Sequence, residues 1–413
     1  MVAYHFPPLA GSSGIQRTLR FVQQLPEFGW QPLVLTTHPR AYERCSPDLD
    51  AELPADCVVR RAFALDTARH LSIAGRYVAA LARPDRWVTW KFGAVREGLR
   101  MIREFKPDLI WSTYPIATAH LIGAELARLS GVPWVADFRD PMAQEGYPAD
   151  TKTWQQFSAI EQSAMQYARL SIFTTPGAAR MYGERYPRAA SRITVVENGY
   201  DEDSFAGAGT APHGPLNPGM VTLLHSGVVY PSERDPTALF VALGRLKRGG
   251  RMLPGKFRLR FRAAAHDSLL NGLAAAHEVQ ELIEVLPPIA YRAALQEMLR
   301  ADALLVMQGA GCNEQIPAKV YEYLRSGRPI LSLTDPRGDT AAVLRDAGIS
   351  ALANLASAED IERQLPAFVE AVCAGKAELP TSDAIQGASR RARTKTLADL
   401  MNGILSRSTK AGA

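Results

Sequence analysis

One segment of the sequence combines a helix start with a base and an acid. Residues 311–322 read Gly-Cys-Asn-Glu-Gln-Ile-Pro-Ala-Lys-Val-Tyr-Glu. Pro317 suits the first turn of a helix, so the amides of Ala318 and Lys319 would face the preceding loop, where a diphosphate is electrostatically favoured. Lys319 adds a full charge, and Glu322 on the same helical face could accept hydrogen bonds from ribose hydroxyls. The alternative is an ordinary ion pair between Lys319 and Glu322.

Two other places could bind an anion. The segment Gly11-Ser12-Ser13-Gly14 precedes a predicted helix, and its glycines would let the backbone approach a phosphate or sugar at the positive end of that helix. A tight turn between strand and helix explains the same residues equally well. Arg234 follows a predicted strand and carries a planar guanidinium that suits phosphate. Taken alone, it is as readily a solvated surface residue.

Candidates for acid–base work follow two strands of the first half. Asp137, Arg139 and Asp140 come directly after the extended run 133–136, and ligands in open α/β sheets bind at the carboxyl ends of strands. An internal pair between an arginine and a carboxylate, which would only shape the loop, is the alternative. His120, three residues into a predicted helix, could act as an acid, a base or a hydroxyl binder, or could be structural.

Short β-branched runs alternate with longer helical segments, a pattern that predicts two sets of βαβ units with parallel sheets. Residues 206–219 hold seven Gly or Pro among fourteen and are predicted to be the boundary between the two sets. The predicted strands are 2–4, 32–36, 109–112, 134–136, 170–174, 193–196, 221–225, 257–262, 282–285, 303–306 and 329–333. The predicted helices are 15–25, 87–104, 117–129, 154–168, 236–247, 268–277, 291–299, 317–326 and 340–346.

Length and composition fit two soluble domains of about 200 residues. The chain has 413 residues, 47% of them hydrophobic, with no apolar run of the roughly 20 residues that a spanning helix needs. Its start lacks the pattern of a signal peptide, and its four cysteines are scattered singly, so we expect a cytoplasmic protein with reduced thiols and no metal site of cysteine type.

Positive charge is concentrated in residues 60–106, which hold 11 Lys or Arg against four acids in a chain of net charge +5. Trp87 and Trp90 are interleaved with these charges. The mixture suits peripheral contact with an anionic membrane. The alternative is that the arginines are solvated and the tryptophans belong to the core. Nucleic acid is not expected as a partner, because no recognised binding module accompanies the charge.

Several motifs together resemble the retaining glycosyltransferases of the family 4 type. They occur in the family's order and are residues 4–11 (Tyr-His-Phe-Pro-Pro-Leu-Ala-Gly), 16–30, 137–141 (Asp-Phe-Arg-Asp-Pro), 198–201 (Asn-Gly-Tyr-Asp) and 316–324 (Ile-Pro-Ala-Lys-Val-Tyr-Glu-Tyr-Leu). The resemblance implies an α/β chain of GT-B fold with two facing Rossmann-like domains. We expect an acceptor-side domain at 1–205, a linker at 206–219, a nucleotide-sugar-binding domain at 220–385, and a C-terminal helix at 386–413 that returns to the first domain.

The resemblance also assigns roles to two acids. Family members carry two glutamates separated by seven residues, the first beside the donor sugar and the second on the ribose; Glu314 and Glu322 have this spacing. Gln315-Ile316-Pro317 replaces the family's usual Gly-Phe-Gly or Pro-Phe-Gly, so the assignment carries over more firmly for Glu322. Many relatives have a histidine after the strand that here ends at Ala136, whereas this chain has Arg139.

We therefore expect transfer of a sugar from a nucleotide diphosphate donor to a hydroxyl acceptor, with retention and without a metal, in polysaccharide or glycolipid assembly. The expected catalytic residues are Asp140, Arg139, His120 and Glu314, and the expected donor-binding residues are Gly11, Ser12, Ser13, Gly14, Arg234, Pro317, Ala318, Lys319 and Glu322. The acceptor could be lipid-linked, and no cofactor beyond the co-substrate is expected. Two alternatives stay open on the same fold: a nucleotide-sugar or carbohydrate binding protein without turnover, and a nucleotide-sugar epimerase.

Overall fold

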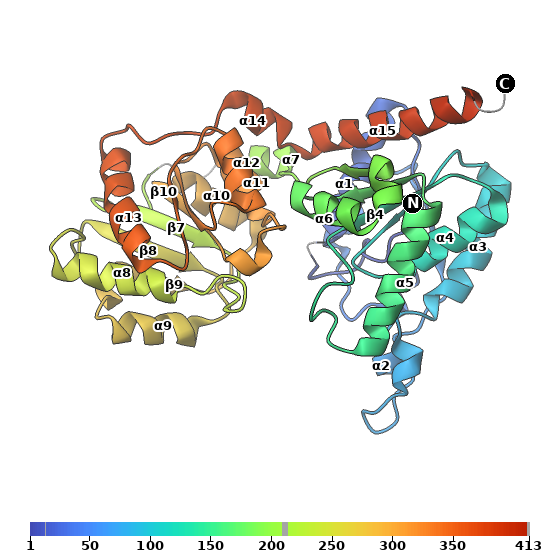
Figure 1. Cartoon of the computed structure of the whole chain (residues 1–413), viewed down its shortest axis with the longest axis horizontal. Coiled ribbons are helices and arrows are strands. Elements are labelled where there is room, and N and C mark those ends of the chain that lie inside the picture. Colours follow the sequence, from blue (N-terminus) through green and yellow to red (C-terminus); the bar gives the residue numbers. More distant parts are fainter. Residues whose placement is uncertain (13, 209–213, 411–413) are drawn as a thin grey trace. The chain divides into compact units, whose positions relative to one another are not determined.

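A computed structural model describes residues 1–12, 14–208 and 214–410, and it divides the chain into two compact units (Figure 1). The first unit comprises residues 1–197 together with 390–413, and the second comprises 198–389. The boundary therefore lies between Glu197 and Asn198, earlier than the predicted linker at 206–219. Residues 209–213 of that linker and 411–413 of the predicted terminal helix fall outside the described residues.

The first unit is built on parallel strands. β2 (Val58–Ala62) pairs with β1 (Leu33–Thr37), and β3 (Ile110–Thr113), β4 (Trp134–Arg139), β5 (Leu170–Phe173) and β6 (Ile193–Val195) follow one another. Val2 joins the two groups, because it bridges Leu35 on one side and Ser112 on the other. The strand predicted at 2–4 is thus reduced to two bridges at a single residue, Val2.

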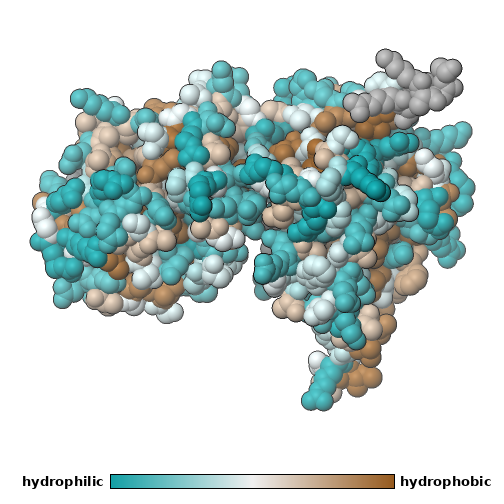
Figure 2. All heavy atoms as spheres, in the orientation of Figure 1, coloured by the Kyte–Doolittle hydropathy of each residue, from teal (hydrophilic) through white to brown (hydrophobic). Residues whose placement is uncertain are grey.

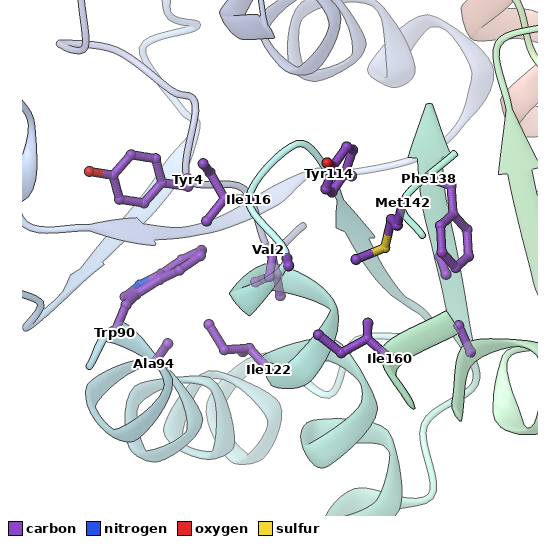
Figure 3. Close-up of a cluster of buried hydrophobic side chains, with 14 of the residues drawn as sticks. Val2, Tyr4, Trp90, Ala94, Tyr114, Ile116, Ile122, Phe138, Met142 and Ile160 are labelled. Atoms are coloured by element: carbon purple, nitrogen blue, oxygen red, sulfur yellow. The ribbon is translucent and has the colours of Figure 1, made fainter. Parts of the chain in front are cut away.

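Helices of the first unit follow its strands. They are α1 (Gly14–Gln24), α2 (Thr67–His70), α3 (Trp90–Phe105), α4 (Thr118–Ser130), α5 (Thr151–Tyr167), α6 (Pro176–Arg185) and the terminal α15 (Arg390–Lys410). In α3 the buried positions Trp90, Ala94, Gly98 and Met101 recur at helical spacing and form one face. Figure 3 shows Trp90 and Ala94 of this face near Ile122 of α4, within the core of the unit.

Many side chains of the charged region 60–106 are buried or held in ion pairs. Trp90 is fully buried and Trp87 is partly buried, so neither tryptophan is a surface anchor. Several of its arginines are occupied by carboxylates: Arg60 pairs with Glu104, Arg83 with Asp150, and Arg86 with both Asp66 and Glu43. The expectation that Trp87 and Trp90 contact a membrane is therefore wrong, whereas membrane contact of the region itself stays a prediction.

The second unit has one six-stranded parallel sheet. Its strand order is β9 (Ile283–Leu286), β8 (Phe257–Arg262), β7 (Val221–Ser226), β10 (Ala303–Gln308), β11 (Ile330–Thr334) and β12 (Leu352–Ala353). Its helices are α7 (Glu202–Ala208), α8 (Thr237–Arg248), α9 (Asp267–Ala276), α10 (Tyr291–Arg300), α11 (Lys319–Ser326), α12 (Asp339–Asp346), α13 (Ala358–Cys373) and α14 (Ser382–Gly387).

Tertiary packing explains why α7 belongs to the second unit. Phe205 and Ala208 are buried in a cluster with Leu295 and Leu304, which lie on α10 and β10. α15, in contrast, packs on α1 of the first unit, where Leu397 and Met401 are buried with Phe21 and Trp111 (Figure 1). Within the described residues, no helix combines the length and hydropathy of a bilayer span.

Candidate functional site

The carboxyl end of β7 places a buried histidine against a lysine. The Nδ1 atom of His225 lies 3.0 Å from the carbonyl oxygen of Leu305 on β10, and its Nε2 atom lies 3.1 Å from the Nζ atom of Lys319. A carbonyl can only accept, so Nδ1 carries the proton and Nε2 accepts from the ammonium. Burial, and next the charge of Lys319, lower the pKa of His225 well below its ordinary value, which keeps the ring neutral.

The ammonium of Lys319 is held in a crowded setting. Its pKa is lowered to about 7 by burial and, to a smaller extent, by the positive charge of Arg234, while the charge of Glu322 opposes the fall. Gly227 has a φ of +107°, and a Cβ at that position would lie 3.1 Å from Lys319 Nζ. Glycine therefore leaves the space that the ammonium occupies. A group with so little compensating negative charge gains from an anionic ligand.

Arg234 supplies the second cation. It is 8% exposed and donates from one terminal nitrogen to Glu233 at 2.8 Å, while its guanidinium lies over the ring of Tyr230. Its buried Nε atom has no hydrogen-bond partner in the described part of the chain. The loop after β7 that carries Arg234 is anchored to the end of β10, because the Gly309 amide donates to the Glu233 carbonyl at 2.6 Å. Part of the hydrogen-bonding capacity of the Arg234 guanidinium is therefore not used within the described part of the chain.

The start of α11 adds backbone amides to the two cations, Lys319 and Arg234. The helix begins at Lys319 with Ala318 as its N-cap, so Pro317 precedes the helix instead of lying in its first turn as predicted. The amides of Val320 and Tyr321 bond back to Pro317 and Ala318. The amides of Ala318 and Lys319 therefore lie ahead of the helical ladder, at the end where the helix dipole favours negative charge.

Glu322 lies one turn into α11 and has a partner from a neighbouring helix. Its Oε1 atom accepts a hydrogen bond from the hydroxyl of Tyr291 at the start of α10, at 2.7 Å. Glu322 also raises the pKa of Lys319 through its charge. The carboxylate is thus close to the cationic group and is oriented by Tyr291.

Glu314 lies in the loop between β10 and α11. Its neighbours anchor that loop: the Asn313 side chain donates to Asp335 at 2.9 Å, and the Gln315 carbonyl accepts from the Thr340 hydroxyl at 3.0 Å. Burial raises the pKa of Cys312, and the charge of Glu314 adds to that rise. Glu314 is therefore held at the carboxyl edge of the same sheet as Lys319.

A second group gathers at the carboxyl edge of the first unit. His5 follows the Val2 bridge, and its Nδ1 atom lies 3.1 Å from the hydroxyl of Ser12. Arg139, at φ +63°, directs one nitrogen to the carbonyls of Gly14 and Tyr114 at 3.3 and 3.4 Å. Burial lowers the pKa of His5 to about 4, with Arg139 adding to the effect.

Other predicted residues surround this group. Asp140 follows Arg139; solvent reaches its side chain, yet the protein packed around it raises the pKa of the carboxyl, an effect that Arg139 and Arg17 oppose. Gly11 has a φ of +79°, which suits the turn into α1. Ser13 lies outside the described residues. The predicted donor-binding glycine segment therefore belongs to the first unit, whereas Arg234, Lys319 and Glu322 belong to the second.

Two charged or polar residues have structural partners. Asp137 receives two hydrogen bonds from Arg17, at 3.0 and 2.9 Å, so its partner is on α1 and is not Arg139. His120 is 1% exposed, with its Nδ1 atom 2.8 Å from the Ser112 hydroxyl and its ring 4.8 Å from that of Phe138. Because it lies in the core and not at the sheet edge, His120 does not join the catalytic candidates.

Three residues of these groups were missed from the sequence. His225 lies at the carboxyl end of β7, Tyr291 begins α10, and His5 follows the strand predicted at 2–4; these positions are the signal that could have drawn attention to them. Across the described ranges, no group of three or more His, Cys, Asp or Glu has the arrangement needed to hold a metal ion.

Residues 13–199 match the family model described as a glycosyl transferase 4-like domain. No curated protein matches the chain by sequence.

Solved structures match over nearly the whole length. A glycosyltransferase from Rickettsia africae is 12% identical with a TM-score of 0.63, covering 98% of each chain. Anabaena HepE, solved in complex with UDP and glucose, is 12% identical with a TM-score of 0.58, covering 99% of each. A protein described as a putative UDP-N-acetylglucosamine 2-epimerase from Listeria monocytogenes is 12% identical with a TM-score of 0.57, covering 99% of this chain and 96% of the other. The GT-B fold is confirmed, with two Rossmann-like units.

Proposed function

The chain carries a glycosyl transferase 4-like domain of the family 4 type within a GT-B fold, and from this premise we propose that it transfers a hexose-type sugar from a nucleotide diphosphate donor to a hydroxyl acceptor. The single observation that carries the donor part is the pairing of Lys319 with neutral His225 beside Arg234 at the start of α11. The proposal includes retention of configuration, independence of divalent metal, and a role in polysaccharide or glycolipid assembly.

The chemistry of the leaving group supports this proposal. When the bond from sugar to phosphate breaks, negative charge accumulates on the nucleoside diphosphate. Lys319, Arg234 and the amides at the start of α11 are donors fixed in advance at one place, which is the arrangement that stabilises such charge without reorganisation. HepE, a protein of the same fold, was solved with UDP and glucose, which makes a UDP-sugar a reasonable first donor to test.

Glu322 and Glu314 complete the proposed donor site. We assign the ribose hydroxyls to Glu322, whose carboxylate is oriented by Tyr291, and the donor sugar to Glu314 in the anchored loop. Pro317 and Ala318 set the start of α11.

The first unit is proposed to bind the acceptor. Asp140 would accept a hydrogen bond from the acceptor hydroxyl, and Arg139 with the segment Gly11 to Gly14 would bind neighbouring polar groups. Asp140→Asn is expected to lower kcat/KM by about 10²-fold or more, the usual range for a lost acid–base group. Calorimetry with UDP should show unchanged donor affinity, because Asp140 belongs to the first unit. Unchanged kcat/KM would remove Asp140 from the catalytic group.

Product analysis tests the reaction class. The full chain is incubated with a panel of nucleotide sugars and hydroxyl acceptors, and the products are resolved by mass spectrometry and NMR. A new glycoside with the donor's anomeric configuration supports the proposal, and its loss in Lys319→Met links it to the donor site. A nucleotide sugar with inverted configuration at one sugar carbon would instead identify an epimerase. Nucleotide-sugar binding without any product would identify a binding protein.

A chelator tests metal independence. Transfer should proceed at an unchanged rate in excess EDTA, because the cations of the proposed donor site are protein side chains. Loss of transfer that is restored only by magnesium or manganese would contradict this part of the proposal.

A further inference from the structure

One loop of the first unit exposes an unusual number of apolar side chains. Residues 71–81, called here the projecting loop, follow α2 and extend away from the unit, as Figure 2 shows at its lower end. Ile73 is 84% exposed and Val78 is 64% exposed. The exposed large hydrophobic residues of the loop are Leu71, Ile73, Tyr77, Val78 and Leu81. Solvent contact at so many apolar groups marks an interaction surface.

The projecting loop has a defined structure, with a tight turn at its tip and a hydrogen bond at its base. Ile73 and Arg76 exchange two backbone hydrogen bonds, at 2.8 and 3.0 Å. The two residues between them, Ala74 and Gly75, have φ of +49° and +74°, which is the geometry of a two-residue hairpin turn. At the base, the hydroxyl of Thr67 donates to the Leu81 carbonyl at 2.7 Å.

The charges of this region have one sign. Residues 67–84 contain three arginines and no aspartate or glutamate. The acids that flank the stretch are withdrawn: Asp66 is buried against Arg86, and Asp85 accepts hydrogen bonds from Thr118. Burial raises the pKa of Asp85, with hydrogen bonds from Thr118 and Trp87 opposing the rise. The stretch 67–84 thus carries no acid of its own, and the acids that approach its edges are paired: Asp150 with Arg83, and Glu43 with Arg86.

Shape and charge together select the partner. A stable protein interface needs about 800 Å² of complementary surface on each side, whereas a hairpin tip closed by a two-residue turn is narrow. Apolar side chains with arginines beside them suit the boundary between lipid headgroups and hydrocarbon, where anionic lipids attract the cations. We propose that the projecting loop docks the first unit on an anionic lipid bilayer, with Ile73 and Val78 entering the headgroup boundary and Arg76 contacting headgroup phosphates.

Docking through this loop would bring the proposed acceptor-binding residues of the first unit, such as Arg139 and Asp140, toward the membrane. The loop lies beyond the carboxyl end of β2, and parallel strands put that end at the same sheet edge as His5 and Arg139. This consequence rests on the proposed function, because it concerns a lipid-linked acceptor. The docking itself does not depend on it.

Vesicle co-sedimentation tests the docking. The full chain is mixed at low and moderate salt with vesicles of phosphatidylcholine alone or with phosphatidylglycerol. We expect salt-sensitive binding to the anionic vesicles and weak binding to the neutral ones. The pair Ile73→Ser with Val78→Ser should lower the partition coefficient about tenfold or more by removing apolar burial. Arg76→Ser should lower it about fivefold.

Matched controls separate this loop from general stickiness. Arg251→Ser with Leu253→Ser removes an exposed arginine and an exposed leucine from a loop of the second unit and should leave binding unchanged. Circular dichroism and UDP affinity by calorimetry verify that each variant is folded.

Equal binding of the wild type and the loop variants, or no binding to anionic vesicles, would overturn the proposal. A dimer in sedimentation velocity that is lost in the loop variants would instead assign the surface to a second copy. Transfer to a soluble acceptor should be unaffected by the loop variants, so failure of docking and failure of the proposed function are distinguishable.

Discussion

The Nε2 atom of His225 lies 3.1 Å from the Nζ atom of Lys319, although 94 residues separate the two in the chain. The histidine is neutral and accepts, while the lysine donates and has a pKa lowered to about 7. The charged groups facing this lysine are Arg234 and Glu322, and His225 itself carries no charge. Charge on Lys319 therefore depends on pH within the physiological range, and an anionic ligand would favour the protonated form.

Lys319 should make donor binding pH-dependent. A base whose pKa is about 7 is protonated below that pH and neutral above it, so the affinity for a UDP-sugar should fall by up to about tenfold per pH unit above pH 7. A UDP-sugar is the suitable probe, because its diphosphate lacks a terminal phosphate that would titrate near neutrality. Calorimetry from pH 6 to pH 9 measures the effect. Lys319→Met should bind about 10- to 150-fold more weakly at pH 6 and lose the pH dependence; a slope retained in this variant would contradict the assignment.

His225 is expected to position Lys319 through its two hydrogen bonds. His225→Gln can still donate to the Leu305 carbonyl and accept from Lys319, whereas His225→Leu can do neither. The leucine variant should lower the free energy of unfolding by about 1 to 3 kcal/mol, because it leaves a buried carbonyl without its donor. It should also weaken UDP-sugar binding and shift its pH midpoint, with glutamine rescuing both effects. A pH midpoint that is unchanged by leucine would limit His225 to a structural role.

Glu322 is expected to recognise ribose and not phosphate. Glu322→Gln should weaken UDP binding about 10- to 150-fold, the cost of a lost charged hydrogen bond, and leave pyrophosphate binding nearly unchanged. Tyr291→Phe, which removes the donor to this carboxylate, should have a smaller effect of up to about tenfold. Isothermal titration of both ligands against each variant checks the prediction. Equal losses for UDP and pyrophosphate would place Glu322 at the phosphates.

The buried pair of Arg17 and Asp137 is expected to stabilise the first unit. Both side chains are nearly inaccessible, at 3% and 0% exposure. Arg17→Met leaves the charge of Asp137 buried with Thr113 as its remaining side-chain donor, which should cost about 3 to 5 kcal/mol in urea unfolding. Arg128→Met, which breaks a solvent-exposed pair with Glu125, is the control and should cost less than about 1 kcal/mol. Similar costs for the two variants would refute the difference.

Buried neutral histidines should make the protein less stable in acid. Burial lowers the pKa of His120 to about 4 from the 6.5 of the exposed group, a fall that the charge of Asp137 opposes. The unfolded chain therefore binds more protons between these values, and the free energy of unfolding falls as pH drops through this window. Between pH 7 and pH 5 this residue contributes a loss of about 2 kcal/mol. Denaturation at both pH values should show that loss reduced in His120→Phe and unchanged in the exposed-site control His38→Gln.

Local signals in the sequence predicted the sheets and a helix near Lys319 and Glu322. The parallel α/β pattern of both units follows from alternating runs of strand and helix period, which need only a few neighbouring residues. The segment from Glu314 to Glu322 was recognisable because a proline, a lysine and an acid have meaning at a helix start. Such features do not depend on the rest of the fold.

Features created by distant contacts were not predictable in this way. The role of His225 depends on the pairing of β7 with β10, which brings Leu305 to its ring from 80 residues away. The partner of Asp137 is Arg17, which is 120 residues distant, so the segment 137–141 read by itself does not reveal it. The boundary was placed too late because glycine and proline content marks an irregular segment, whereas the packing of Phe205 decides which unit that segment joins.

The chain leaves the first unit once, after Glu197, and returns once, at Arg390. The outgoing and returning segments contact each other within each unit. On one side Arg393 forms an ion pair with Glu197, and on the other the Tyr200 amide donates to the Ala388 carbonyl at 3.1 Å. In topological terms the second unit is an insert whose entry and exit lie next to each other. It can therefore be exchanged as a cassette from residue 198 to residue 389, with a single pair of junctions to preserve. Chimaeras made at these junctions would test whether donor preference moves with the second unit, to which we assign donor binding in the proposed function.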